Sequence, residues 1–304
     1  MSDMRVRLCG VELKNPVIAA SGTFGYGMEY NEFFPVSRLG GISCKGTTLR
    51  ERQGNPSPRI AETPAGMLNS VGLQNPGVDM FLNTYLPWLK QQDTVVIANL
   101  AGHSVEEYAA MAERLDDSSV DMVELNISCP NVREGGVNFG TSCDMVERVT
   151  RAVRERCRKP LMVKLTPNVT DIGEIAAAAE AAGADCISLI NTLTGMRIDI
   201  KSRRPVLHNN TGGLSGPAVF PVAVRMVRDV YRRVSIPVVG MGGVSTWEDA
   251  AEMMIAGAAA IQVGAANFRD PYAMVKIIDG LTAFAEQTGL QSIAELTGTL
   301  KEWE

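Results

Sequence analysis

One cysteine lies among residues that could take part in chemistry. Cys129 is placed between Asn126 and Asn131, directly after an apolar run and next to a proline. A free thiol titrates at about pH 8.5, and it can remove a proton if its surroundings lower that value or if loss of a hydride drives the step. A lone cysteine after a strand is more often buried and inert. The flanking amides and a nearby Gly135-Gly136 pair, typical of a mobile lid, favour Cys129 as a general base.

Two lysines also follow apolar runs directly. A lysine chosen at random keeps its charge in water, but Lys45 and Lys164 come at points where a cation is costly unless it serves an anion. If the ligand is a flavin, a lysine beside its pyrimidine ring would stabilise the negative charge of the reduced form.

The other polar residues at such positions are mostly amides. Asparagine side chains offer donors and acceptors without charge, which suits a flat heterocycle whose edge alternates C=O and N–H groups. Metal hydrolysis would need histidines and carboxylates, and the only histidines are His103 and His208. The six cysteines include no C-x-x-C pair, so neither a zinc nor an iron–sulfur site is predicted.

Glycines follow the last two apolar runs of the chain. Gly242-Gly243 and Gly264-Ala265 stand where barrel proteins often bind a phosphate on backbone N–H groups. One such pair is weak evidence because glycine is the usual turn residue. Two at consecutive strands predict a phosphate-bearing cofactor.

These residues need elements that bring them together. Short runs rich in Val, Ile and Leu alternate with amphipathic, Ala-rich stretches, which is typical of β-α units. No linker divides the chain, so we predict an α/β fold: one (β/α)8 TIM barrel domain over residues 1–304. A doubly wound open sheet is the alternative, but no strand is followed by a G-x-G-x-x-G turn. The predicted strands are Val17–Ala20, Gly41–Lys45, Val95–Leu100, Met122–Ile127, Leu161–Leu165, Cys186–Ile190, Val238–Met241 and Ala260–Val263.

Helix starts and long insertions complete the prediction. Ser104, Asp171 and Ser245 each precede a glutamate by three residues, as helix N-caps do. Two stretches, 46–86 and 192–216, are too long for ordinary βα loops. In a barrel, long functional loops belong to the face where strands end, and chemistry is found at that same face.

Composition excludes several function classes. The chain is 45% hydrophobic and 21% charged, with a formal net charge of −5, which argues against a nucleic-acid surface. The basic runs Arg151–Lys159 and Arg225–Arg233 have helical spacing and are interpreted as solvated helix faces. The most apolar stretch, Ala250–Ala266, contains Glu252 and Gln262, and the first residues carry no signal-peptide core. We therefore expect a soluble, cytoplasmic protein that binds no membrane.

Seven motifs in this order resemble the class 1 dihydroorotate dehydrogenases, over nearly the whole chain. The segments 22–27 and 72–77 are most similar to the class 1B catalytic subunit. The motifs are Ala20-Ser21-Gly22-Thr23-Phe24-Gly25, Lys45-Gly46-Thr47, Asn69-Ser70-Val71-Gly72-Leu73-Gln74-Asn75-Pro76-Gly77, Asn126-Ile127-Ser128-Cys129-Pro130-Asn131, Val163-Lys164-Leu165, Asn191-Thr192 and Gly240-Met241-Gly242-Gly243-Val244.

The resemblance implies an FMN-containing barrel that oxidises (S)-dihydroorotate to orotate in pyrimidine synthesis. Cys129 would take the C5 proton while the C6 hydride passes to the flavin; class 2 members have a serine there and an amino-terminal extension that this chain lacks. Ala265 stands where the family often has a threonine. Substrate contacts would be Lys45, Asn69, Val71, Gly72, Leu73, Asn126, Asn131, Asn191 and Thr192. FMN contacts would be Ala20, Ser21, Gly22, Lys45, Asn99, Asn126, Lys164, Ile190, Gly216, Gly242, Gly243, Gly264 and Ala265.

Class 1B resemblance also implies a partner. A second subunit would carry FAD and a 2Fe–2S cluster and pass electrons to NAD+, because this chain has neither the cluster spacing nor the dinucleotide motif. A homodimer of this chain within a heterotetramer is implied. Three alternatives remain: a class 1A enzyme that reduces fumarate, another FMN barrel such as a tRNA dihydrouridine synthase, and a non-enzymatic phosphate-binding barrel.

Overall fold

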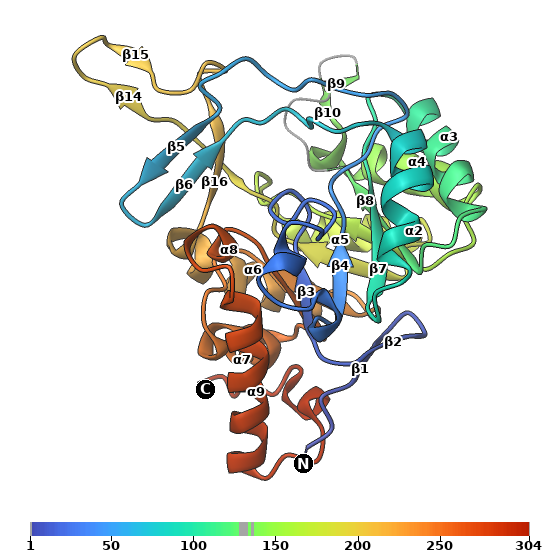
Figure 1. Cartoon of the computed structure of the whole chain (residues 1–304), viewed down its shortest axis with the longest axis vertical. Helices are drawn as coiled ribbons and strands as arrows, with labels where there is room; N and C mark the ends of the chain where they lie inside the picture. The colour runs from blue at the N-terminus through green and yellow to red at the C-terminus, as the bar shows by residue number, and fades with distance from the viewer. Residues whose placement is uncertain (1, 128–132, 135–136, 304) are drawn as a thin grey trace.

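Eight parallel strands close into a barrel at the centre of the computed structural model, which describes residues 2–127, 133–134 and 137–303 (Figure 1). The barrel strands are buried on both faces, as their Val, Ile and Leu content predicts. The (β/α)8 prediction is confirmed, and each strand begins where predicted and ends within two residues of the predicted end. In barrel order the strands are β11 (Leu161–Lys164), β12 (Cys186–Leu189), β17 (Val238–Met241), β18 (Ala260–Val263), β3 (Val17–Ala19), β4 (Gly41–Ser43), β7 (Val95–Leu100) and β8 (Met122–Asn126).

Helices surround the barrel, except between its first two strands. There the chain forms two 3-10 turns, η1 (Tyr30–Glu32) and η2 (Val36–Arg38), because positive-φ glycines and Pro35 interrupt any longer helix. The helices are α1 (Val78–Met80), the π-helix η3 (Phe81–Tyr85), α2 (Leu86–Leu89), α3 (Val105–Asp116), α4 (Cys143–Arg154), α5 (Ile172–Ala181), α6 (Phe220–Tyr231), α7 (Trp247–Ala256), α8 (Ala266–Arg269) and α9 (Ala273–Thr288), with 3-10 turns η4 (Phe139–Thr141), η5 (Pro217–Val219) and η6 (Ile293–Leu296).

Two of the three predicted helix caps are confirmed. The Ser104 hydroxyl accepts a hydrogen bond from the Glu107 backbone, and the Asp171 carboxylate accepts two from the first turn of α5. The prediction for Ser245 is wrong. Helix α7 is capped instead by Thr246, which forms a reciprocal capping box with Asp249, because Thr-x-x-Asp one residue later satisfies both backbone N–H groups.

The two long insertions form one antiparallel sheet. Strands β5 (Ile60–Thr63) and β6 (Gly66–Asn69) come from the first insertion, and β13 (Leu193–Gly195) and β16 (Gly212–Ser215) from the second; the order is β13-β16-β6-β5. A hairpin of β14 (Ile198–Asp199) and β15 (Arg204–Pro205) extends from this sheet, at the end of the molecule away from both termini (Figure 1). The insertions therefore bring segments about 145 residues apart into register, with Asn69 opposite Gly213.

Short elements complete the fold. An antiparallel hairpin of β1 (Val6–Leu8) and β2 (Val11–Leu13) packs Leu8 and Leu13 into the core, and β9 (Arg133–Glu134) pairs with β10 (Val137–Asn138). Within the described residues, no helix has both the length and the apolar character needed to cross a membrane.

Candidate active site

A cavity of about 540 Å³ opens at the carboxyl ends of the barrel strands, beneath the antiparallel sheet. Its size is that of a small-molecule site, and its position is where barrel proteins bind ligands. The lining includes most of the residues predicted to contact substrate or cofactor. Those that line it are Ala20, Ser21, Gly22, Lys45, Asn69, Val71, Gly72, Leu73, Asn126, Lys164, Ile190, Asn191, Thr192, Gly216, Gly242, Gly243, Gly264 and Ala265.

The other three predicted residues are Cys129, Asn131 and Asn99. Cys129 and Asn131 lie outside the described residues. Asn99 is absent from the cavity lining; it is 1% exposed and lies below the floor, where its side chain donates to Glu124 and accepts from Asn126. The five described cysteines are all free thiols, and none of them lines the cavity.

Backbone loops after β17 and β18 form one end of the cavity. Gly242 and Gly243 have φ values of 121° and 81°, and a Cβ on Gly243 would lie 2.7 Å from the Phe220 Cβ, so no side chain fits there. Gly264 differs, because a Cβ there would make only ordinary contacts, the nearest at 3.6 Å. Packing does not require glycine at position 264; its absence of a side chain leaves space for a ligand beside the backbone.

Lys164 is the cation of the cavity floor. The side chain follows strand β11, is only 4% exposed and forms no hydrogen bond or ion pair with the described part of the chain. Burying an ammonium group without acceptors is costly, so its donors call for acceptors from a ligand. Lys45, the other predicted lysine, is half-buried at the end of β4, and its backbone N–H donates to the Gly25 carbonyl at 2.9 Å.

A buried carboxylate beneath this floor was not predicted. Glu124 of β8 is fully buried, and burial raises its pKa, but the Lys164 ammonium and hydrogen bonds from Ser43, Gln262 and Asn99 outweigh that and leave the pKa below its ordinary value. Glu124 is therefore an anion at neutral pH. The signal in the sequence is that Glu124 is a charged residue in the middle of an otherwise apolar strand. Ser43, Ser188 and Gln262 are likewise polar residues within apolar strands.

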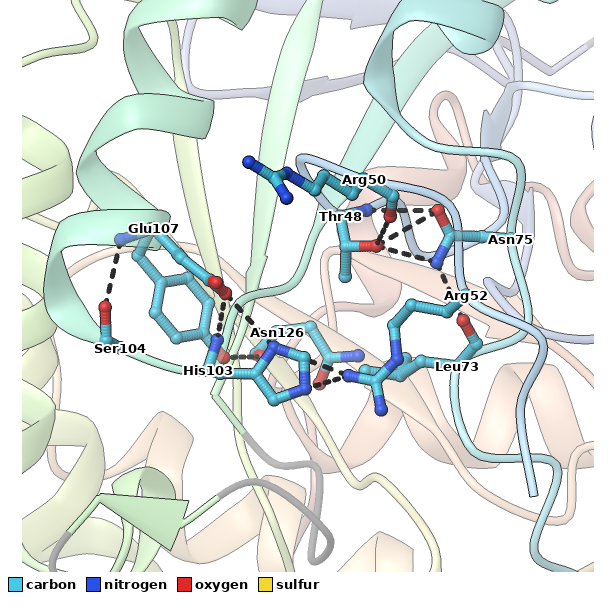
Figure 2. Close-up of polar contacts among 10 residues, drawn as sticks. Thr48, Arg50, Arg52, Leu73, Asn75, His103, Ser104, Glu107 and Asn126 are labelled. Carbon is cyan, nitrogen blue, oxygen red and sulfur yellow. Dashed lines mark hydrogen bonds and ion pairs between the residues drawn. The ribbon is translucent and has the colours of Figure 1, made fainter.

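The loop 70–75 forms the wall on the side of β4. Gly72 and Leu73 both have positive φ, 78° and 56°, and Asn75 fixes this turn. Figure 2 shows the Asn75 amide between Thr48 and the Leu73 carbonyl: its Nδ2 donates to the Thr48 hydroxyl at 2.9 Å and to the Leu73 oxygen at 2.7 Å. The Asn75 Oδ1 accepts from the backbone of Thr48 and Gly77. Because Asn75 is 4% exposed, solvent does not compete with these bonds.

Residues of helix α3 and the insertion hold the neighbouring edge. The Tyr108 hydroxyl donates to the Asn126 backbone oxygen at 2.9 Å, which anchors the end of β8. His103 lies between Glu107 and Arg52 (Figure 2); His103 is exposed to solvent, and Glu107 and Arg52 are partly exposed. His103 is thus a surface residue, as predicted.

The far wall follows β12. The Asn191 backbone donates to the Leu165 carbonyl at 2.9 Å, and the Asn191 Oδ1 accepts from the Thr192 backbone at 2.8 Å. Asn69, on the opposite insertion, donates to the Gly213 carbonyl at 3.4 Å. Gly213 also allows Thr192 to pack closely against β16, because a Cβ on Gly213 would lie 1.9 Å from the Thr192 hydroxyl oxygen. The amides of Asn69 and Asn191 therefore line the same cavity.

The fold and the cavity define a (β/α)8-barrel protein with an amide-rich ligand site at the strand carboxyl ends. A family model described as dihydroorotate dehydrogenase matches residues 3–284. The chain belongs to the dihydroorotate dehydrogenase family. It is 54% identical over 298 residues to the "Dihydroorotate dehydrogenase B (NAD(+)), catalytic subunit" of Alkaliphilus oremlandii, which covers 98% of this chain and 99% of the relative.

Relatives from two other bacteria carry the same name. The protein of Bacteroides fragilis is 52% identical over 302 residues, and that of Petrotoga mobilis 49% over 300 residues; each alignment covers 99% of this chain and all of the relative. Both alignments span nearly the whole chain and therefore include the two insertions as well as the barrel strands.

Proposed function

We propose that this chain is the catalytic subunit of a dihydroorotate dehydrogenase that oxidises (S)-dihydroorotate to orotate in pyrimidine synthesis and passes the electrons to NAD+. The observation that carries the proposal is a buried Lys164 ammonium in an amide-lined cavity, within a chain that matches the named relatives over nearly its full length. We further propose a single cytoplasmic domain spanning residues 1–304.

The described residues fit FMN. Lys164 lacks acceptors within the described chain, Gln262 has a buried Oε1 without a donor among the same residues, and Gly264 leaves open space beside Ala20. Bound FMN would supply the acceptor for the substrate hydride. Backbone N–H groups of Gly242, Gly243, Gly264 and Ala265, with Gly216, would bind the phosphate. Ala20, Ser21, Gly22, Lys164 and Ile190 would surround the ring, with Asn99 acting from beneath.

The chain's own residues would orient the substrate and move its proton. Lys45, Asn126, Asn131, Asn191 and Thr192 would bind the carboxylate and the imide groups of dihydroorotate, because their donors and acceptors match such groups. The loop residues Asn69, Val71, Gly72 and Leu73 would cover it and exclude water. Cys129 would accept the C5 proton; none of the described thiols lines the cavity, which supports this assignment.

Burial explains why another thiol would not replace it. Cys44 directly follows strand β4, but it is 1% exposed, and burial raises its pKa far above the ordinary value. A neutral buried thiol cannot act as a base near neutral pH. We therefore expect Cys129→Ala to retain FMN while dihydroorotate-dependent flavin reduction falls roughly 10²–10⁴-fold, the usual contribution of a positioned base. Stopped-flow absorbance measures this, and near-normal reduction would reject Cys129 as the base.

The identity of the electron acceptor is tested by adding a partner subunit to the purified chain. The relatives' names contain "catalytic subunit" and "NAD(+)", which supports a separate electron-transfer subunit. We propose that it carries FAD and a 2Fe–2S cluster and joins a homodimer of this chain in a heterotetramer. The purified chain alone should be yellow and bleach with dihydroorotate, yet reduce NAD+ only when the partner is added. Efficient fumarate reduction by the lone chain would contradict the NAD+ assignment.

A further inference from the structure

Glu124 connects five strands of the barrel through its carboxylate. It stands on β8 and accepts hydrogen bonds from Ser43 of β4 at 2.6 Å and Asn99 of β7 at 2.6 Å. It also accepts from Ser188 of β12 at 2.9 Å and Gln262 of β18 at 2.7 Å. All five side chains are at most 1% exposed. Each carboxylate oxygen thus receives two donors, so the group is held rigidly in a dry interior.

Because an ionised carboxylate can only accept hydrogen bonds, it fixes the orientation of the amide side chains beside it. Gln262 must direct its Nε2 to Glu124, which leaves its Oε1 as a buried acceptor with no donor among the described residues. Asn99 must likewise direct its Nδ2 to Glu124, so its Oδ1 faces Asn126 and accepts from the Asn126 Nδ2 at 3.5 Å. Gln262 and Asn126 both line the cavity. The Glu124 anion therefore determines how the Gln262 and Asn126 amides are oriented at the floor of the cavity.

The charge of Lys164 is a second reason for a carboxylate at position 124. Lys164 lies on β11, which pairs with β8, and it lines the cavity while only 4% exposed. Each of these two buried charges would be costly alone, and each lowers the cost of the other. Because the Glu124 carboxylate is already saturated by four neutral donors, the Lys164 donors remain available to a ligand.

We propose that Glu124 is a positioning residue that sets the polarity of the cavity floor: it supplies the counter-charge of Lys164 and turns Gln262 so that an acceptor meets the ligand. The floor then presents a cation and a neutral acceptor to its ligand. This pair complements a ring edge on which a C=O group adjoins an N–H group, as on the pyrimidine side of a flavin. The inference rests on the proposed function and adds Gln262 and Glu124 to the groups that tune the cofactor.

The test is the midpoint potential of bound flavin in Glu124→Gln. The variant keeps the size of the side chain but removes the negative charge, so the reduced, anionic flavin should be stabilised. We expect the ratio of oxidised to reduced FMN dissociation constants to rise about tenfold, which is a potential more positive by about 30 mV for a two-electron couple. An unchanged potential in a variant that binds FMN would overturn the proposal.

Ser188→Ala is the matched control. It removes one hydrogen bond to Glu124 and leaves the charge, so it should lower thermal stability. The ratio of oxidised to reduced FMN dissociation constants, which sets the flavin potential, should change by no more than about twofold. A shift equal to that of Glu124→Gln would show that packing, and not charge, sets the potential, and would also overturn the proposal.

A second variant tests the amide. Gln262→Leu keeps Glu124 and Lys164 but removes the acceptor, and we expect oxidised FMN to bind about tenfold more weakly, measured by fluorescence titration of apoprotein. Unchanged affinity would refute the role of Gln262, even if Glu124→Gln failed to fold. Wild-type protein that binds no flavin would instead contradict the proposed function, so the two failures are distinguishable.

Discussion

Replacing Lys164 with methionine removes the cation of the cavity floor while keeping an unbranched side chain of similar length. Two consequences follow from the structure. Glu124, which is fully buried, loses the charge that offsets its own. The cavity also loses its one buried ammonium among the described residues, and with it the donors available to a ligand.

The magnitudes can be estimated separately. Removing one partner of a buried ion pair costs about 3–5 kcal/mol. Lys164 is 4% exposed, so solvent screening is small, but no hydrogen bond joins it directly to Glu124, and we take the lower end, about 3 kcal/mol. For a protein of this size that lowers Tm by roughly 5 °C. Loss of a charged hydrogen bond, about 1.5–3 kcal/mol, would weaken FMN binding roughly 10–150-fold.

The assay is thermal unfolding of the apoprotein for Lys164→Met, Glu124→Gln and the double variant. The double variant leaves neither charge unpaired. Its free energy of unfolding should therefore be at least about 1 kcal/mol higher than the value predicted by adding the two single effects. Lys276→Met is the control, since Lys276 is 69% exposed and its pair with Asp270 contributes less than about 1 kcal/mol. Strict additivity of the two core substitutions would refute the counter-charge argument.

Three further outcomes are expected. Gly243→Ala should weaken FMN binding at least tenfold because the new Cβ clashes with Phe220, whereas Gly289→Ala, with a similar φ of 75° and nothing within 4 Å, should cost only the strain of about 1–2 kcal/mol and leave binding unchanged; equal titration curves would contradict this. Asn75→Ala should raise the KM for dihydroorotate more than it lowers kcat, since it frees the 70–75 loop; a pure kcat effect in steady-state assays would argue otherwise. Wild-type stability should fall more steeply than that of Glu124→Gln as pH drops below about 4.5, because a carboxylate with a lowered pKa stabilises the fold above its unfolded pKa and loses that contribution as pH falls through the folded one; parallel urea-unfolding profiles from pH 5 to pH 3 would exclude it.

Local patterns were sufficient to predict the barrel. All eight strands are short apolar runs whose type depends on burial on both faces, and β7, β17 and β18 have the predicted bounds. Ser104 and Asp171 were recognisable as caps because a cap acts within three residues. The same rule misplaced the start of α7, where Ser245 and Thr246 both offer a hydroxyl and only the backbone geometry selects Thr246.

What the sequence by itself determined is the periodic pattern of buried strands, and the motifs at their carboxyl ends that belong to the dihydroorotate dehydrogenase family. Only the tertiary structure decided that the two insertions pair into one sheet over the cavity, and that Asn99 lies below the floor while Lys164 belongs to it. It also brought Glu124 within hydrogen-bond distance of four other strands. The physical reason is that strand formation depends on neighbours along the chain, whereas the stability of a buried charge depends on donors up to 138 residues away that only barrel closure assembles.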